Sequence, residues 1–139
     1  MKERTLTAER EAIPEVIAFL DAELDALGCP RRAKMQIDIA ADELYSNLAN
    51  YAYAGEKGPV TVGIEALQDP PAVRVIFRDR GLPFNPLESR DPDVTLPAAQ
   101  RKIGGLGIFV VKKSMDEVRY EYRNGENILT IRKNLEDHG

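Results

Sequence analysis

The sequence predicts an α+β fold, a two-layer α/β sandwich in which helices cover one face of a mixed, mostly antiparallel sheet. Two patterns support this class. Apolar residues recur every three or four positions in three segments, as in helices, and alternate with polar residues in several others, as in strands. The elements follow in the order strand, helix, helix, strand, strand, loop, helix, strand, strand. At this chain length of 139 residues, we expect a single domain over residues 1–139.

The first half of the chain is predicted to be mostly helical. A short strand at a sheet edge, residues 4–8, precedes a helix over residues 12–27, which tolerates Pro14 in its first turn and ends at Gly28. A second helix is expected over residues 31–53. Its apolar stripe comprises Ile37, Ala40, Ala41, Leu44, Leu48 and Tyr51.

The second half is predicted to supply most of the sheet. Residues 60–67 and 73–77 alternate in polarity, which indicates two antiparallel strands. Residues 81–107 show little periodicity, and a loop of that length inside a compact domain is usually functional or partly disordered. The chain is expected to finish with a helix over 106–115 and a hairpin of strands 118–122 and 128–131 around Asn124-Gly125.

Composition excludes several classes of protein. The formal charge is −4, from 19 basic and 23 acidic residues, and no basic face is evident, so direct nucleic-acid binding is disfavoured. The single Cys29 allows no internal disulfide, and the single His138 leaves no material for histidine catalysis or a zinc site. No signal-peptide core or membrane-spanning apolar run is present, so we expect a cytoplasmic protein without a membrane partner.

A carboxylate and an amide lie one helical turn apart in the second helix. Glu43 and Asn47 are four positions apart and therefore share one side of the helix, and Asn50 extends the same polar edge. Phosphoryl transfer needs an oxygen ligand for Mg²⁺ and a base that orients the attacking hydroxyl. An amide suits the metal, since a second carboxylate would repel a triphosphate. The ordinary alternative is a solvated helix flank.

A second motif follows the strand at residues 73–77. The carboxylate of Asp79 could accept a hydrogen bond from the amino group of adenine, and Gly81 would let the base approach the backbone. Val75, Ile76 and Phe77 could supply apolar wall nearby. The ordinary alternative is a turn that ends a strand.

A glycine-rich segment forms the third motif. It comprises Gly104, Gly105, Leu106 and Gly107. Free backbone N–H groups at the start of the following helix would bind phosphate, and the glycines would allow a close approach. Arg101 and Lys102 could reach a terminal phosphate. The alternatives are a flexible entry to a core helix and two solvated loop charges.

In this order, the motifs resemble those of the histidine-kinase-like ATP-binding domain of the GHKL superfamily, which has the Bergerat fold. That superfamily includes gyrase-type topoisomerases, heat-shock chaperones of the ninety-kilodalton class, sensor histidine kinases and MutL-type repair proteins. Glu43-x-x-x-Asn47 resembles the N box, Asp79-x-Gly81 with Pro83-Phe84 resembles the first glycine box, Gly105-x-Gly107 resembles the second, and the loop between the glycine boxes resembles the ATP lid.

Within the superfamily, the likeness is greatest to the bacterial anti-sigma-factor serine kinases. Their signature is similar to Asp-x-Gly-x-Pro-Phe-x-Pro followed by Gly-Gly-Leu-Gly-Ile-Phe-Val-Val-Lys-Lys-Ser-Met-Asp-Glu-Val. The resemblance implies ATP with Mg²⁺, and transfer of the γ-phosphate to a serine of an anti-sigma-factor antagonist of the STAS type. It also implies alternate sequestration of a sigma factor, usually by a homodimer.

The resemblance also implies a role for each matched residue. Glu43 becomes the catalytic base, Asn47 the Mg²⁺ ligand, Asp79 and Gly81 the adenine contacts, and Gly105 and Gly107 the phosphate cradle. Phe84 and Leu106 belong to the matched glycine boxes and are expected beside the nucleotide. The leading hypothesis is therefore a serine kinase. The alternative is a non-catalytic ATP-sensing module of the same fold, in which nucleotide switches a protein partner.

Overall fold

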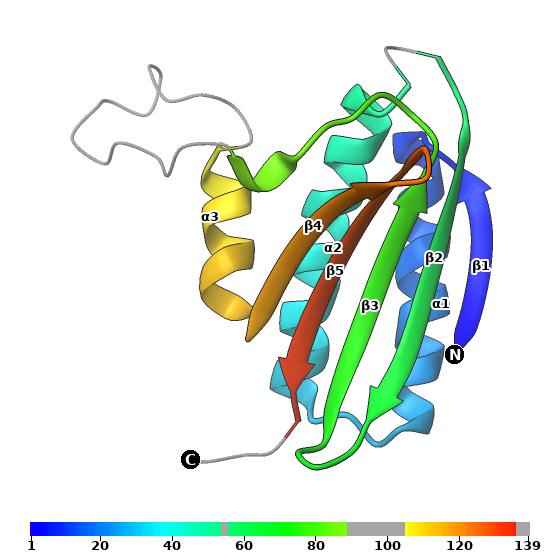
Figure 1. Ribbon diagram of the computed structural model, residues 1–139. Coiled ribbons are helices and arrows are strands. Elements are labelled where there is room, and N and C mark those ends of the chain that lie inside the picture. The colour runs from blue at the N-terminus through cyan, green and yellow to red at the C-terminus, as the bar shows by residue number, and fades with distance from the viewer. Residues whose placement is uncertain (54–55, 89–104, 136–139) are drawn as a thin grey trace.

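The computed structural model describes residues 1–53, 56–88 and 105–135, and it confirms the α+β class. Within these residues, five strands form one sheet in the order β1-β2-β3-β5-β4, with the helices on one face (Figure 1). The strands are β1 (Lys2–Thr7), β2 (Pro59–Leu67), β3 (Ala72–Asp79), β4 (Glu117–Arg123) and β5 (Glu126–Asn134). The helices are α1 (Ile13–Ala26), α2 (Arg31–Tyr51) and α3 (Gly105–Ser114), with short 3-10 turns η1 (Arg10–Ala12) and η2 (Pro86–Glu88).

The sheet is antiparallel throughout rather than mixed. Strands β2 and β3 form one hairpin and β4 and β5 another, and β5 pairs with β3 so that the two hairpins share a single sheet. The β3–β5 register places Asp79 opposite Asn127. The short N-terminal strand lies at an edge, as expected. Element bounds agree with the sequence expectation to within a few residues, and the largest difference is the greater length of β5.

The hydrophobic core lies between the sheet and the helices. Strand alternation turns one set of side chains inward, and helical periodicity turns matching stripes of α1 and α2 toward it. The buried helical residues include Val16, Leu20, Leu24, Ile37, Ala40, Ala41, Leu44 and Leu48, and the buried strand residues include Val60, Val62, Val73, Val75, Phe77, Leu129 and Ile131. This layer fixes the position of α2 against β3, and with it the distance between the first two motifs.

Two tyrosines of α2 differ from the expectation. Tyr51, predicted for the apolar stripe, is 50% exposed, because the helix ends there and the buried position passes to Ala52. Tyr45 instead is fully buried, and its hydroxyl donates to the carbonyl of Thr7 at 2.6 Å. This bond ties α2 to the edge strand β1.

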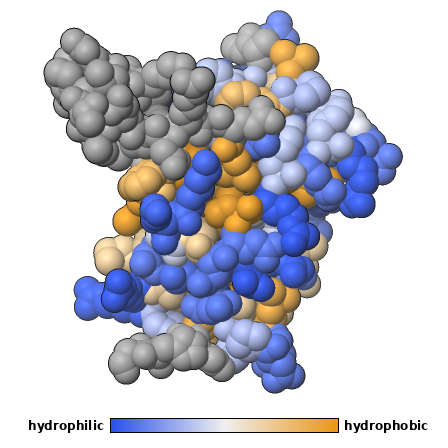
Figure 2. Space-filling model, turned by 60° about the vertical axis from the view of Figure 1, so that its left-hand side comes forward, coloured by the Kyte–Doolittle hydropathy of each residue, from blue (hydrophilic) through white to orange (hydrophobic). Residues whose placement is uncertain are grey.

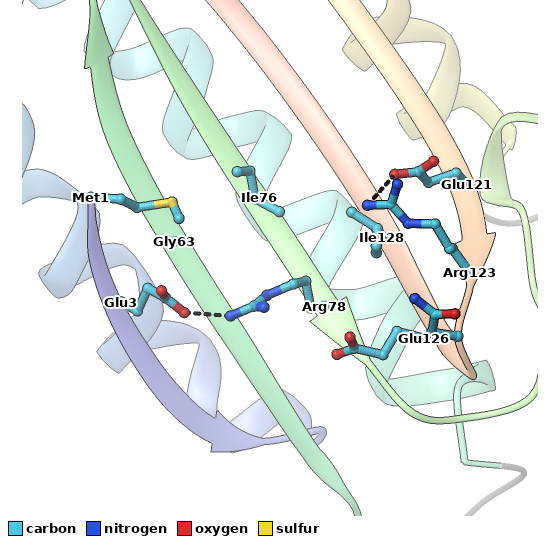
Figure 3. Close-up of a pocket in the computed structure, with 10 residues that line it drawn as sticks. Met1, Glu3, Gly63, Ile76, Arg78, Glu121, Arg123, Glu126 and Ile128 are labelled. Carbon is cyan, nitrogen blue, oxygen red and sulfur yellow. Dashed lines mark hydrogen bonds and ion pairs between the residues drawn. The ribbon is translucent and has the colours of Figure 1, made fainter.

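The sheet face away from the helices carries a shallow pocket of about 280 Å³ (Figure 3). Ile76 lies there, so the expectation that it forms part of a wall beside Asp79 is wrong. Alternation along β3 sends Ile76 to the opposite face from Val75 and Phe77, whose side chains are buried in the core. Arg78 forms an ion pair with Glu3 on this open face.

The face of the molecule on the α3 side is mostly polar (Figure 2). Seen with the α3 side turned forward, hydrophilic residues cover much of the face and apolar side chains gather near its middle (Figure 2). Among the described residues, none of the three helices combines the length and apolar character that crossing a bilayer requires.

Candidate functional site

The site begins with Glu43 and Asn47, which lie one turn apart on α2. The Asn47 Nδ2 donates to the backbone carbonyl of Glu43 at 2.9 Å and to its Oε1 at 3.2 Å. Both partners are acceptors, so the amide must turn its NH₂ group toward Glu43, and its Oδ1 faces the other way. Both side chains are half-buried, and Asn50 lies further along the helix with an exposed side chain.

The Glu43 carboxyl group meets the third motif. A Cβ built on Gly107 would overlap the Cδ and both carboxylate oxygens of Glu43, so only glycine leaves room for this carboxylate. Burial raises the pKa of Glu43 above its ordinary value, and the hydrogen bond from Asn47 partly opposes that shift. Two segments that are more than sixty residues apart in the chain therefore meet at one carboxylate.

Gly105 and Leu106 form the first turn of α3 together with Gly107. The helix therefore begins one residue before the expected start, and two of the motif's glycines are part of it. The first N–H groups of a helix have no partner within the helix, and they carry the positive end of its dipole. The remaining residues of this motif, Gly104, Arg101 and Lys102, lie outside the described residues.

Asp79 ends β3 as a buried carboxylate with 2% of its surface exposed. Its Oδ1 accepts two hydrogen bonds, from the backbone N–H of Gly81 at 2.8 Å and from Nδ2 of Asn127 at 2.9 Å. Its Oδ2 is buried and has no hydrogen-bond partner in the described part of the chain. Burial raises the pKa of Asp79, and the two hydrogen bonds oppose that shift. An unpaired buried carboxylate oxygen is costly, and it is suited to a donor from a ligand.

Gly81 joins this carboxylate to the end of α2. A Cβ at Gly81 would overlap the backbone carbonyl of Ala52, and the next residue, Leu82, donates its N–H to the same carbonyl at 2.8 Å. The turn after β3 is therefore packed backbone against backbone on the helix that carries Glu43. This contact brings the first and second motifs into one region.

Phe84 completes that turn. Its ring lies against Tyr51, with centroids 4.9 Å apart and ring planes inclined by 33°. Its backbone N–H donates to Oδ1 of Asn127 at 3.1 Å. The half-buried Phe84 is therefore held between the end of α2 and the start of β5.

Asn127 is the residue of this region that sequence reasoning missed. It is 3% exposed, and its amide bonds to Asp79 and to the turn that follows. A signal was available, because Asn127, Leu129 and Ile131 share the inward phase of the alternation along β5. A polar residue at a buried phase indicates a specific hydrogen-bonding role.

Comparisons with known proteins show the family of the chain. Residues 6–133 match the family model described as a histidine kinase-like ATPase domain. The chain is 31% identical over 134 residues to the serine-protein kinase RsbW of Listeria monocytogenes, an alignment that covers 89% of this chain and 83% of that protein. It is 23% identical over 100 residues to the serine/threonine-protein kinase BtrW of Bordetella bronchiseptica, covering 72% of this chain and 70% of that one.

Solved structures show the same fold. The structure of the RsbU and RsbW domains of Rv1364c from Mycobacterium tuberculosis superposes with a TM-score of 0.67 at 20% identity, over 97% of this chain and 33% of that chain. The Acinetobacter baumannii histidine kinase AdeS superposes with a TM-score of 0.54 at 13% identity, over 99% of this chain and 70% of that chain. Two relatives of this chain are thus named protein kinases, one a serine-protein kinase and the other a serine/threonine-protein kinase. The chain belongs to the histidine kinase-like ATPase domain family.

Proposed function

We propose that this chain is a protein serine kinase of the anti-sigma-factor type, which transfers the γ-phosphate of ATP to a serine of an anti-sigma-factor antagonist. The observation that carries the proposal is the contact between Glu43 and Gly107, because it sets a carboxylate suited to a base beside a helix N-terminus suited to phosphate. The relatives named serine-protein kinase support the same reaction.

Asp79 and Gly81 would hold the adenine ring. The Asp79 Oδ2 is a buried acceptor without a partner among the described residues, and the exocyclic amino group of adenine is a donor that would satisfy it. A 6-oxo purine such as guanine would instead place a carbonyl oxygen, a second acceptor, opposite Oδ2 of Asp79. The site is therefore expected to prefer adenine to guanine, with Phe84 close by on the same turn.

The first turn of α3 would hold the phosphates. Backbone N–H groups from Gly105 to Gly107 lie at the positive end of the helix dipole, where anions bind. We extend the proposal to Gly104, Arg101 and Lys102, which precede the helix in the sequence. Their role in holding the phosphates stays a prediction.

Asn47 would hold Mg²⁺ through its Oδ1, since its NH₂ group is engaged by Glu43. Asn50 extends the same polar edge. When bound, Mg²⁺ supplies positive charge that neutralises the phosphate oxygens during transfer. A neutral amide suits this position, because a carboxylate would add repulsion to a triphosphate.

Glu43 would act as the base. As the serine oxygen bonds to the γ-phosphorus, the bond from phosphorus to the β–γ bridging oxygen breaks, ADP leaves, and the hydroxyl proton passes to the Glu43 carboxylate. Burial makes this carboxylate a stronger base than an exposed one, because its pKa is raised. The hydrogen bond from Asn47 orients it.

The remaining part of the proposal concerns partners. In the partner-switching arrangement of this kinase class, the chain binds either an antagonist of the STAS type or a sigma factor, as a homodimer, and phosphorylation of the antagonist decides which one. No residue described above is assigned to those surfaces.

A transfer assay tests the proposal. The purified chain is incubated with Mg²⁺, γ-labelled ATP and the small STAS-type proteins of its own genome, and nucleotide affinity is measured by calorimetry. We expect label on one of these proteins. Glu43→Gln should keep ATP affinity within about threefold and lose at least about a hundredfold in transfer rate. Asp42→Asn, the exposed neighbour on the same helix, serves as the matched control and should keep both the ATP affinity and the transfer rate of the wild-type chain.

The outcomes separate the two hypotheses of function. Binding of Mg-ATP without transfer to any candidate would favour the non-catalytic ATP-sensing module. A well-folded chain that binds no ATP would contradict both.

A further inference from the structure

The amide of Asn127 is the most heavily hydrogen-bonded side chain beside Asp79. Its Nδ2 donates to Oδ1 of Asp79 at 2.9 Å and to the carbonyl of Leu82 at 2.9 Å, with the carbonyl of Gly81 further away at 3.4 Å. Its Oδ1 accepts from the backbone N–H of Phe84 at 3.1 Å and from the hydroxyl of Tyr120. One side chain of β5 therefore connects β4, the end of β3 and the turn that follows.

The protein uses the hydrogen-bonding capacity of this amide fully. An asparagine offers two N–H donors and a carbonyl oxygen with two lone pairs, and two good acceptors and two donors of the chain occupy them. Nothing is left for a purine base. Any effect of Asn127 on nucleotide binding must therefore pass through Asp79 or the turn.

The bond to Asp79 determines which carboxylate oxygen is available. Oδ1 already accepts from Gly81 as well as from Asn127, whereas Oδ2 accepts no hydrogen bond within the described residues. Two donors on one oxygen also restrict rotation of the carboxylate about its last torsion angle. Without the amide, the carboxylate would keep a single anchor and could turn.

We propose that Asn127 is a positioning residue for base selectivity, which holds Oδ1 of Asp79 so that Oδ2 alone faces the 6-amino group of adenine. The inference rests on the proposed ATP site and adds to it a residue on β5 that touches no ligand. Its alternative is a purely structural role, in which the amide only pins the turn after β3. The two roles predict different ligand selectivity.

The test compares two nucleotides that differ only in the 6-amino group. Dissociation constants are measured by calorimetry for ATP and for purine riboside triphosphate, which has hydrogen in place of that group. We expect the wild-type chain to prefer ATP by about tenfold or more, as for a hydrogen bond to a charged group. Asn127→Ala should bring that ratio close to one, with affinity for purine riboside triphosphate changed by less than about threefold.

Two further variants sharpen the test. Asn134→Ala is the matched control, since it removes the same side chain from the far end of the same strand, opposite Ala72. It should keep the wild-type ratio. Tyr120→Phe removes one donor to Oδ1 of Asn127 and should lower the ratio about two- to fivefold. If circular dichroism shows that Asn127→Ala does not fold, Tyr120→Phe takes its place in the test. An unchanged ratio of ATP affinity to purine riboside triphosphate affinity in Tyr120→Phe would then overturn the inference.

The failures are distinguishable. If Asn127→Ala folds and weakens both nucleotides equally while the preference for ATP persists, Asn127 is only a structural pin and the inference is overturned, whereas the proposed function stands. If the wild-type chain binds neither nucleotide, or binds both equally, the assignment of Asp79 to adenine fails and the inference falls with it.

Discussion

The carboxyl group of Glu43 occupies the space that a side chain at Gly107 would need. The overlap involves the far end of a flexible side chain and not backbone. A larger residue at 107 can therefore be accommodated if Glu43 turns away. This relationship makes the position of the proposed base depend on a glycine in another helix.

Gly107→Ala should therefore impair transfer more than folding. The new methyl group displaces the carboxylate from its place beside Asn47, so we expect a loss of at least about tenfold in the rate of phosphate transfer. The unfolding temperature should change by only a few degrees, or about 1 kcal/mol in the free energy of unfolding. Gly63→Ala on β2, where the new methyl would meet the flexible side chain of Met1, is the control and should leave transfer unchanged. An equal transfer rate in both variants would contradict the dependence of Glu43 on Gly107.

Gly81→Ala should instead destabilise the fold. Its Cβ would overlap the backbone carbonyl of Ala52, which cannot move without shifting the end of α2. The hydrogen bond from Leu82 to that carbonyl would be lost or lengthened as well. We expect the free energy of unfolding to fall by about 2–4 kcal/mol, measured by urea titration. If Gly81→Ala lowered the free energy of unfolding by less than Gly107→Ala does, the turn after β3 would be less tightly packed than its contacts imply.

Asp79→Asn should exchange base preference while keeping the fold. The amide oxygen of the new asparagine can accept the bonds from Gly81 and Asn127, which leaves its NH₂ group at the position of Oδ2. A donor there opposes the amino group of ATP and matches the 6-oxo group of inosine triphosphate. We expect ATP affinity to fall about ten- to a hundredfold and the ratio of ATP to inosine triphosphate affinity to invert. Calorimetry with both nucleotides measures this, and an unchanged ATP affinity would remove Asp79 from the site.

A pH dependence of stability is expected from Asp38. Burial, followed by the hydrogen bond with Asp21 and the charge of that residue, raises its pKa from 3.8 to about 7, although Lys34 opposes the shift. The folded state therefore keeps a proton that the unfolded chain has released, and the free energy of unfolding falls as the pH rises from about 4 to about 7. Both Asp21 and Asp38 have a buried carboxylate oxygen without a partner among the described residues.

Asp38→Asn should flatten this slope. It removes a charge that the fold buries, so we expect about 1–2 kcal/mol of added stability near pH 8, after allowance for the partial exposure of the group. Urea unfolding near pH 5 and near pH 8 provides the measurement. Asp42→Asn, an exposed aspartate on the same helix, should retain the wild-type slope. Persistence of the slope in Asp38→Asn would assign it to another group.

The local parts of the proposed site could be predicted from sequence because each depends only on the periodicity of one helix or one strand. Helical periodicity alone puts Glu43 and Asn47 on one side of α2, and strand alternation alone places Asp79 in the inward phase of β3. The same reasoning failed for Tyr51, whose exposure depends on where the helix ends. It also failed for Ile76. That residue was expected beside Val75 and Phe77, but successive residues of a strand point to opposite faces of the sheet.

By itself, the sequence determined the kinds of element, their order and the pairs of side chains within one turn or one strand, since these follow from backbone geometry over a few residues. Only the tertiary structure decided that Glu43 meets Gly107, that Gly81 packs on Ala52 and that Asn127 lies opposite Asp79. These contacts span more than twenty residues each. Their distances are set by the packing of α2 and α3 on the sheet and by the register of β3 with β5, which no local pattern encodes.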